Sequence, residues 1–212
     1  MKKLWVGLVA VLLAGSFTLQ SAVASEGVYV VKPVAGKKVK QLPAGPLYWR
    51  VENFPTLAQA QAAIPPDRWN PDTVSNDSAL SLAAEVAGKV WLFTLGPKGG
   101  STPGGTKVAE VGPVPVIAAS EYLLRVNHGY GPPGAKTPVH THPGSEAFYV
   151  VAGRLGQKTA HGVAHVDAGQ TMNGHNADMV MQVFNSGTTD LTALIMFVVD
   201  ANRPFSTPAK FE

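Results

Sequence analysis

The sequence predicts an all-β fold, and the spacing of its short apolar segments carries this prediction. From Thr106 onward, runs of β-branched and aromatic residues alternate with turns, and the 212-residue chain contains 22 Gly and 17 Pro. Such spacing, without long helical periods, is typical of a β-barrel or β-sandwich. The clearest strands of this part are expected at residues 106–111, 121–127, 147–151, 162–166 and 193–199.

The preceding part of the chain is predicted to add further strands. Residues 47–52 alternate as a strand does, and residues 89–95 are aromatic and β-branched enough for a buried strand. The run 79–86 fits a helix or a strand. Residues 96–105 are rich in Gly and Pro, so we expect a loop there.

One short helix is expected between these strands, and a tail after the last strand. Thr56 can cap a helix over residues 57–63, which Pro65-Pro66 would end. The polar tail 204–212 is expected to lie on the surface.

The N-terminus has the features of a secretory signal peptide. Lys2 and Lys3 precede an apolar stretch, residues 4–15, that is short for a membrane span, and small residues occupy positions 22–24. Cleavage after residue 24 would export the chain to the periplasm or the medium. We therefore expect a mature protein that begins at Ser25 and keeps no stable membrane span.

Charge and cysteine content exclude several classes of function. Without Lys2 and Lys3 the chain has 15 basic and 14 acidic residues, and its one basic cluster, residues 37–40, is expected to be solvated. Nucleic-acid binding needs more clustered cations, so we expect none. The absence of cysteine excludes disulfides, thiolate nucleophiles and iron–sulfur clusters.

Two histidines and a carboxylate lie within seven positions. His140 and His142 are two residues apart, so on a strand both side chains leave the same face. The turn at Pro143-Gly144 would let Glu146 approach them from a neighbouring strand. Two neutral imidazoles and one carboxylate form a set that binds divalent first-row metals.

The spacing around this set is Gly134, five residues, His-x-His, three residues, Glu146, six residues and Gly153. It resembles the first motif of the cupin superfamily, with all five marker positions filled. The resemblance implies an antiparallel jelly-roll barrel that holds one divalent metal inside through His140, His142 and Glu146. Fe, Mn, Zn, Ni and Cu all remain candidates.

The domain organisation follows from this resemblance. We expect a cupin barrel over residues 114–212 and an N-terminal extension, residues 25–113, that packs on it with strands and one or two short helices. A degenerate second cupin within residues 40–112 is an alternative. Cupins often form homodimers by exchanging edge strands, and residues 25–60 would supply such a strand.

The second cupin motif is degenerate, which leaves the fourth metal ligand open. Aligning Asn185-Ser-Gly187 with the family places Met181 where a histidine is usual. His175 from the preceding loop, or Gln182 after a one-residue slip, are alternatives. Met181 itself could offer a thioether or pack in the core, with water completing the coordination.

Two further residues are candidates for the pocket. On the strand 121–127, Arg125 shares a face with Asn127, and if that face turns inward, Arg125 would clamp a substrate carboxylate. We expect this half-polar face to be solvated instead. Tyr149 is the second candidate.

Two functions remain open at this stage. The first is a metal-dependent small-molecule enzyme, because a three-ligand metal keeps open positions for substrate. The resemblance to cupins implies a dioxygenase-type oxidoreductase, an isomerase or a lyase. The second is a non-catalytic module that binds a small ligand or a metal. Fold alone does not choose between them.

Overall fold

The computed structural model describes residues 27–64, 80–115 and 117–212. The expected signal peptide, with its cleavage site before Ser25, and Pro65-Pro66 lie outside the described residues. In the described ranges no helix has the length and apolar character needed to span a membrane.

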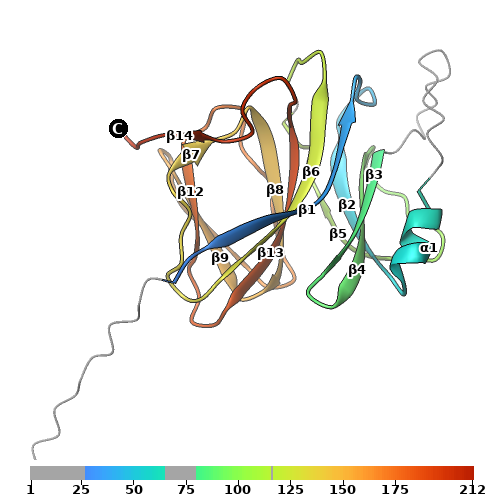
Figure 1. The fold of residues 1–212 in the computed structure, drawn as a ribbon, viewed down its shortest axis with the longest axis horizontal. Coiled ribbons are helices and arrows are strands. Elements are labelled where there is room, and N and C mark those ends of the chain that lie inside the picture. The colour runs from blue at the N-terminus through green and yellow to red at the C-terminus, as the bar shows by residue number, and fades with distance from the viewer. Residues whose placement is uncertain (1–26, 65–79, 116) are drawn as a thin grey trace, which may run out of the picture.

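Three antiparallel sheets make up the molecule (Figure 1). The first has the order β1 (Val30–Val39), β6 (Tyr122–Gly131), β13 (Leu191–Asp200), β8 (Gly144–Ala152) and β11 (Thr171–Met172). The second has the order β10 (Gly162–Asp167), β9 (Arg154–Thr159), β12 (Met181–Asn185), β7 (His140–Thr141) and β14 (Thr207–Pro208). The third has the order β3 (Leu80–Val86), β4 (Lys89–Gly96), β2 (Tyr48–Phe54) and β5 (Thr106–Val111).

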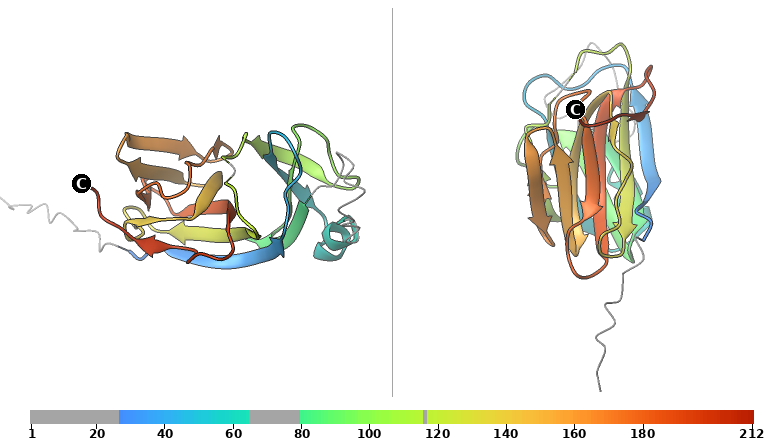
Figure 2. Two further views of the ribbon diagram at one scale, coloured as in Figure 1. Left: turned by 90° about the horizontal axis from the view of Figure 1, so that it is seen from above. Right: turned by 90° about the vertical axis from the view of Figure 1, so that its left-hand side faces the viewer.

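The first two sheets face each other and form the barrel, and the third covers the outside of the first (Figures 1 and 2). Strand β13 shows both interfaces. Ile195 and Phe197 point into the barrel core, whereas Leu194, Met196 and Val198 join a second core. That second core contains the large side chains of the third sheet, Trp49, Trp91 and Phe93 among them. The first sheet is therefore buried on both faces.

This architecture confirms the predicted all-β jelly-roll barrel with an N-terminal extension. The ambiguous run 79–86 contains strand β3, and the single described helix of the extension is α1 (Leu57–Ala62). The Thr56 hydroxyl accepts a hydrogen bond from the Gln59 backbone N–H at 3.2 Å, which is the expected N-cap. Among the described residues, 48–111 form one sheet and this helix rather than a second barrel.

Strand β1 ties the extension to the barrel. The sequence shows no clear period here, yet residues 30–39 pair with β6 along its whole length, from Val30 opposite Tyr130 to Val39 opposite Tyr122. The segment expected to exchange between two copies is thus paired within its own chain. It also contains most of the basic cluster 37–40, whose side chains are largely exposed.

Most of the C-terminal tail is exposed, as predicted, but the tail is also anchored to the barrel. Residues Thr207 and Pro208 form β14 against β7, and Ala209 donates its backbone N–H to the Val139 carbonyl at 3.0 Å. Phe205 turns into the mouth of the barrel and contacts Phe197, with ring centroids 4.9 Å apart. Phe205, an aromatic residue in a polar tail, is half-buried because the barrel end offers it an apolar surface.

Candidate metal centre

The strands place the predicted ligands at one end of the barrel. His140 and His142 lie at and directly after β7, and Glu146 lies on the neighbouring sheet in β8. Gly153 ends β8 with a φ of 77°, and a Cβ there would lie 2.6 Å from the Asp190 carbonyl oxygen. Only glycine accommodates this turn and close approach, which explains one marker of the motif.

Both imidazoles are held by backbone carbonyls through the same ring nitrogen. Nδ1 of His140 lies 2.8 Å from the Pro138 carbonyl oxygen, and Nδ1 of His142 lies 2.6 Å from that of Phe205. A carbonyl only accepts, so each Nδ1 carries the hydrogen and each Nε2 keeps its lone pair. This tautomer is the one that offers Nε2 to a metal.

Glu146 is a buried carboxyl with a single hydrogen-bond donor. Its Oε1 accepts from the Gln157 side-chain amide at 2.7 Å. Burial raises its pKa to about 8, and the Gln157 hydrogen bond offsets this only in part. At neutral pH the carboxyl therefore keeps its proton unless a cation compensates the charge.

His142 is shifted in the opposite direction. Burial lowers its pKa to about 4, while its hydrogen bond to the Phe205 carbonyl acts the other way. Its Nε2 lies 3.8 Å from Oε2 of Glu146. This distance would suit an ion pair, but at neutral pH both groups are neutral in the protein alone, so the contact is not a salt bridge.

The donor chemistry fits a divalent metal, but the side chains are not drawn together around one point. The His140 and His142 rings lie 4.8 Å apart at their centroids, near Glu146. Within the described ranges, no three His, Cys, Asp or Glu side chains are arranged closely enough to hold an ion as they stand. Ligation would require the His140 ring and the Glu146 carboxyl to close on His142.

Met181 faces the barrel interior, as expected for the candidate fourth ligand. Met181 is buried and pairs with His140 across the β12–β7 ladder. Its Sδ lies 3.5 Å from the Gln157 amide nitrogen, which also binds Glu146. The thioether thus faces the interior beside the carboxyl.

The two alternative fourth ligands point elsewhere. Gln182 follows Met181 on β12, so its side chain leaves the other face and donates to the Thr137 carbonyl at 2.8 Å. His175 lies in the loop before β12 and does not line the barrel cavity. Its pKa is lowered mainly by burial and, to a smaller extent, by the nearby His161. The structure brings neither to Glu146.

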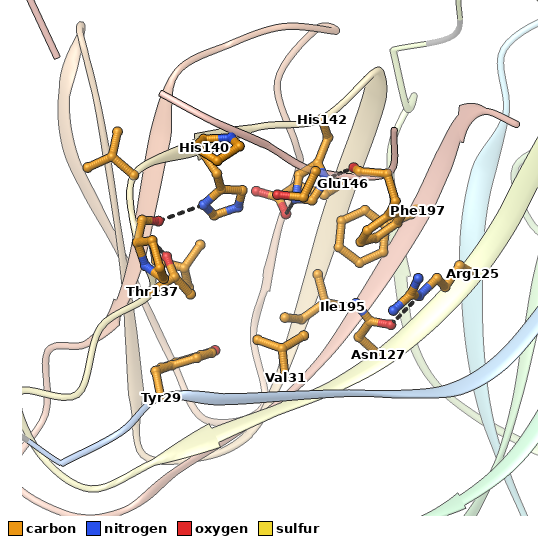
Figure 3. A pocket seen from close by; sticks show the side chains of 16 residues that line it. Tyr29, Val31, Arg125, Asn127, Thr137, His140, His142, Glu146, Ile195 and Phe197 are labelled. Atoms are coloured by element: carbon orange, nitrogen blue, oxygen red, sulfur yellow. Dashed lines mark hydrogen bonds and ion pairs between the residues drawn. The ribbon is translucent and has the colours of Figure 1, made fainter. Parts of the chain in front are cut away.

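A cavity of about 400 Å³ opens beside the histidines (Figure 3). Its polar lining includes Tyr29, Arg125, Asn127 and Thr137 besides His140, His142 and Glu146, and its apolar lining includes Val31, Val183, Ile195 and Phe197. The size lies within the usual range for small-molecule sites, about 300–1,000 Å³.

Arg125 lines this cavity, so the expectation that its strand face is solvated is wrong. The opposite face of β6, with Leu124 and Val126, is covered by the third sheet. The prediction for Tyr149 is also wrong, because its ring packs against Trp91 of the third sheet with centroids 5.8 Å apart. In both cases the third sheet determines which side of the strand faces inward.

Sequence reasoning missed four residues of the site. Tyr29 and Asn127 line the cavity, Gln157 holds Glu146, and Phe205 closes the mouth. The alternation of residues along strand β9 was a usable signal for Gln157. On a strand, Gln157 shares one face with Leu155 and Thr159, and this face is buried. No pattern in the sequence marks Tyr29 or Phe205.

Comparison with known proteins adds similarity at the level of fold only. No family model and no curated protein matches the chain. Solved structures with partial likeness include the DMSP lyases RdDddP and RnDddQII, with a TM-score of 0.36, 24% identity and coverage of 41% of this chain and 44% of that one. DMSP lyase DddQ from Ruegeria pomeroyi gives a TM-score of 0.36 at 20% identity, with coverage of 41% of this chain and 43% of that one. Recombinant oxalate oxidase in complex with glycolate gives a TM-score of 0.34 at 22% identity, with coverage of 40% of this chain and 45% of that one.

In each of these cases the matched region spans less than half of the known structure. TM-scores in this range support no conclusion about the activity of this chain. The function has to be argued from the cavity itself.

Proposed function

We propose that this chain is an exported, metal-dependent cupin enzyme that acts on a small molecule bound in the barrel cavity. His140, His142 and Glu146 would hold one divalent metal ion at the histidine end of the cavity. The remaining space would take the substrate.

The observation that carries the proposal is the matched orientation of the two imidazoles. Each Nδ1 is fixed by a backbone carbonyl, at 2.8 Å for His140 and 2.6 Å for His142, which leaves both Nε2 atoms as acceptors. Such outer contacts typically set the tautomer of a metal-binding histidine. Surface histidines in a Pro/Gly-rich turn would not be expected to share this arrangement.

Glu146 adds a second argument. A buried carboxyl without a cationic partner is costly, and its raised pKa shows that the charged form is unfavourable in the protein alone. A divalent cation would remove this cost by compensating the charge. Gln157 orients the carboxyl by holding Oε1, so that Oε2 is directed toward His142.

A metal with three protein ligands supplies open positions and Lewis acidity, which suits oxidative cleavage, isomerisation or elimination. The chain's own contribution is orientation and exclusion of water. Phe205 and Phe197 cover the face of His142, with ring centroids 4.9 Å away in each case. The reacting end of a substrate would therefore lie in an apolar surrounding.

The test is metal content. We expect the wild-type protein to bind about one equivalent of zinc or manganese after metal-free preparation, and the His140→Ala/His142→Ala/Glu146→Gln variant to bind none. The matched control is His161→Ala/His165→Ala, which removes two histidines of the exposed β9–β10 region and should leave metal content unchanged. Equal metal content in the triple variant and the wild type would reject the site.

A binding module without catalysis is the second candidate, and Met181 favours it. The thioether occupies the position where the family usually has a third imidazole as fourth ligand, so a bound metal would have an altered ligand set. Substrate turnover by the metal-loaded protein distinguishes the two functions. Retained ligand binding without turnover would support the module.

Export remains part of the proposal and rests on the sequence of the first 24 residues. Sequencing the N-terminus of protein recovered from the periplasm or the medium tests it. The expected first residue is Ser25, and a chain that still begins at Met1 in that fraction would contradict the proposal.

A further inference from the structure

We infer that the cavity binds a small organic carboxylate, with Arg125 and Asn127 of strand β6 holding the carboxylate group. This inference rests on the proposed function only in taking the cavity as the substrate site. Its evidence comes from β6 and not from the metal ligands.

Arg125 supplies a positive charge without a counter-charge. Its guanidinium lines the cavity, and no carboxylate among the described residues forms an ion pair with it. Its one side-chain hydrogen bond runs from Nε to Oδ1 of Asn127 at 2.7 Å. The Phe205 ring lies under the guanidinium at 4.0 Å, which fixes its plane and leaves both Nη groups available as donors.

Asn127 supplies a second donor, and its orientation is fixed. Because arginine can only donate, the atom that contacts Nε must be the amide oxygen. The Nδ2 group therefore faces away from Arg125, and it is fully buried without a partner among the described residues. A buried amide N–H₂ without an acceptor costs stability, so the side chain is arranged for an acceptor that a ligand would bring.

Arg125 and Asn127 together match a carboxylate better than other anions. One cation balances one negative charge, and the Nη and Nδ2 donors can meet two carboxylate oxygens. A phosphate dianion would need more donors and a second cation. The Tyr29 hydroxyl, also buried and unpartnered, provides one more donor within the same cavity.

The rest of the cavity determines the remainder of the ligand. Figure 3 places Arg125 and Asn127 apart from the histidines, with Ile195 and Phe197 between the two groups. Both groups line the same pocket of about 400 Å³, and the Phe205 ring lies next to both, with its centroid 4.0 Å from the Arg125 guanidinium and 4.9 Å from the His142 ring centroid. The ligand that fits has a carboxylate at the β6 end, a short apolar body, and its reacting group at the histidine end.

The experiment compares benzoate with benzamide, which differ in charge but hardly in shape. Binding is measured by calorimetry on the full chain kept metal-free with a chelator, so that metal ligation plays no part. We expect benzoate to bind about 10- to 100-fold more tightly than benzamide, as a charge-assisted pair allows. Arg125→Gln should abolish this preference and leave benzamide affinity within about twofold.

Two further variants keep the test decisive. Asn127→Asp places a carboxylate beside Arg125, which should neutralise the guanidinium internally and also remove the preference for benzoate. Arg154→Gln is the matched control, because Arg154 pairs with Asp167 on the exposed surface, at 3.4 Å. It should bind both probes as the wild type does, and thermal melts establish that each variant is folded.

Equal affinity for the two probes in the wild type would overturn the inference, as would a preference that survives in both Arg125→Gln and Asn127→Asp. Its failure is separable from failure of the proposed function. A protein that binds metal but does not prefer benzoate contradicts the carboxylate site alone. A protein that prefers benzoate but takes up no metal contradicts the metal centre alone.

Discussion

Glu146→Gln should stabilise the metal-free protein, and the gain should grow with pH. The folded protein holds the Glu146 proton up to a pKa of about 8, whereas the unfolded chain releases it near the ordinary value of 4.5. Between these values the unfolded state binds fewer protons than the folded state. The free energy of unfolding therefore falls as pH rises, and the cost is complete above pH 8.

The magnitude follows from the width of this window. Each pH unit changes the unfolding free energy by about 1.4 kcal/mol for one proton. From the ordinary value of 4.5 to about 8 the destabilisation amounts to about 4–5 kcal/mol, of which about 2 kcal/mol falls between pH 6.5 and 8. Gln keeps the shape and an oxygen for Gln157 but has no titrating group.

His142 affects the wild-type profile in a different window. Its pKa is lowered to about 4 in the folded protein, so the unfolded state binds the extra proton between about 4 and the ordinary 6.5. In that range its stability contribution rises with pH and opposes that of Glu146. The His142 contribution cancels when the unfolding free energies of Glu146→Gln and the wild type are subtracted, because both proteins contain His142.

Urea unfolding at pH 5, 6, 7 and 8 in the presence of a chelator measures this difference. We expect it to increase steadily in favour of Glu146→Gln. With excess zinc the order should reverse, because the metal stabilises only the wild type through Glu146. A difference that is constant across the four pH values, or a variant that is less stable at pH 8 without metal, would refute the argument that burial holds Glu146 neutral.

Three other substitutions test separate parts of the site. Met181→His should tighten zinc binding by at least about tenfold, since it adds an imidazole next to the proposed metal site. A destabilised variant with unchanged affinity would show that this side chain serves core packing only. Phe205→Ala should lower the unfolding free energy by about 1–2 kcal/mol in urea, since it removes the ring under Arg125, whereas an unchanged value would mean that the tail does not hold the mouth. Gly174→Ala should cost about 1–3 kcal/mol, because its Cβ would overlap the Glu146 carbonyl oxygen; a thermal melt like that of the wild type would contradict this close packing.

The barrel and the placement of His140, His142 and Glu146 at one end of it were predictable because both depend on local patterns. The His-x-His spacing places His140 and His142 on one face of a strand, and the strand after Pro143-Gly144 carries Glu146 toward them. The register that places Met181 inward followed from Asn185, whose amide holds the Gly131 and Thr189 carbonyls at the turn after β12. These features could be read from residue spacing within two short segments of the sequence, although Asn185 itself bonds to the distant Gly131.

The inward face of β6 was not predictable from its own sequence. Arg125 and Asn127 alternate with Leu124 and Val126, and alternation normally turns the apolar side toward the core. Here the apolar side also faces a core, which the third sheet supplies from residues more than 10 positions away in the chain. The polar side is left facing the cavity, and the same long-range packing turns Tyr149 away from it.

The double burial of the first sheet has a consequence for dividing this protein. Its outer face carries Leu124, Leu194 and Met196, all fully covered by the third sheet. A chain that began at residue 114 would leave this apolar face bare. It would also lack β1 and Tyr29, which directly precedes β1 and lines the cavity. Such a fragment would be prone to associate through that surface. The extension is therefore part of the folding unit, and trimming the protein to its motif-bearing half should yield a fragment that aggregates.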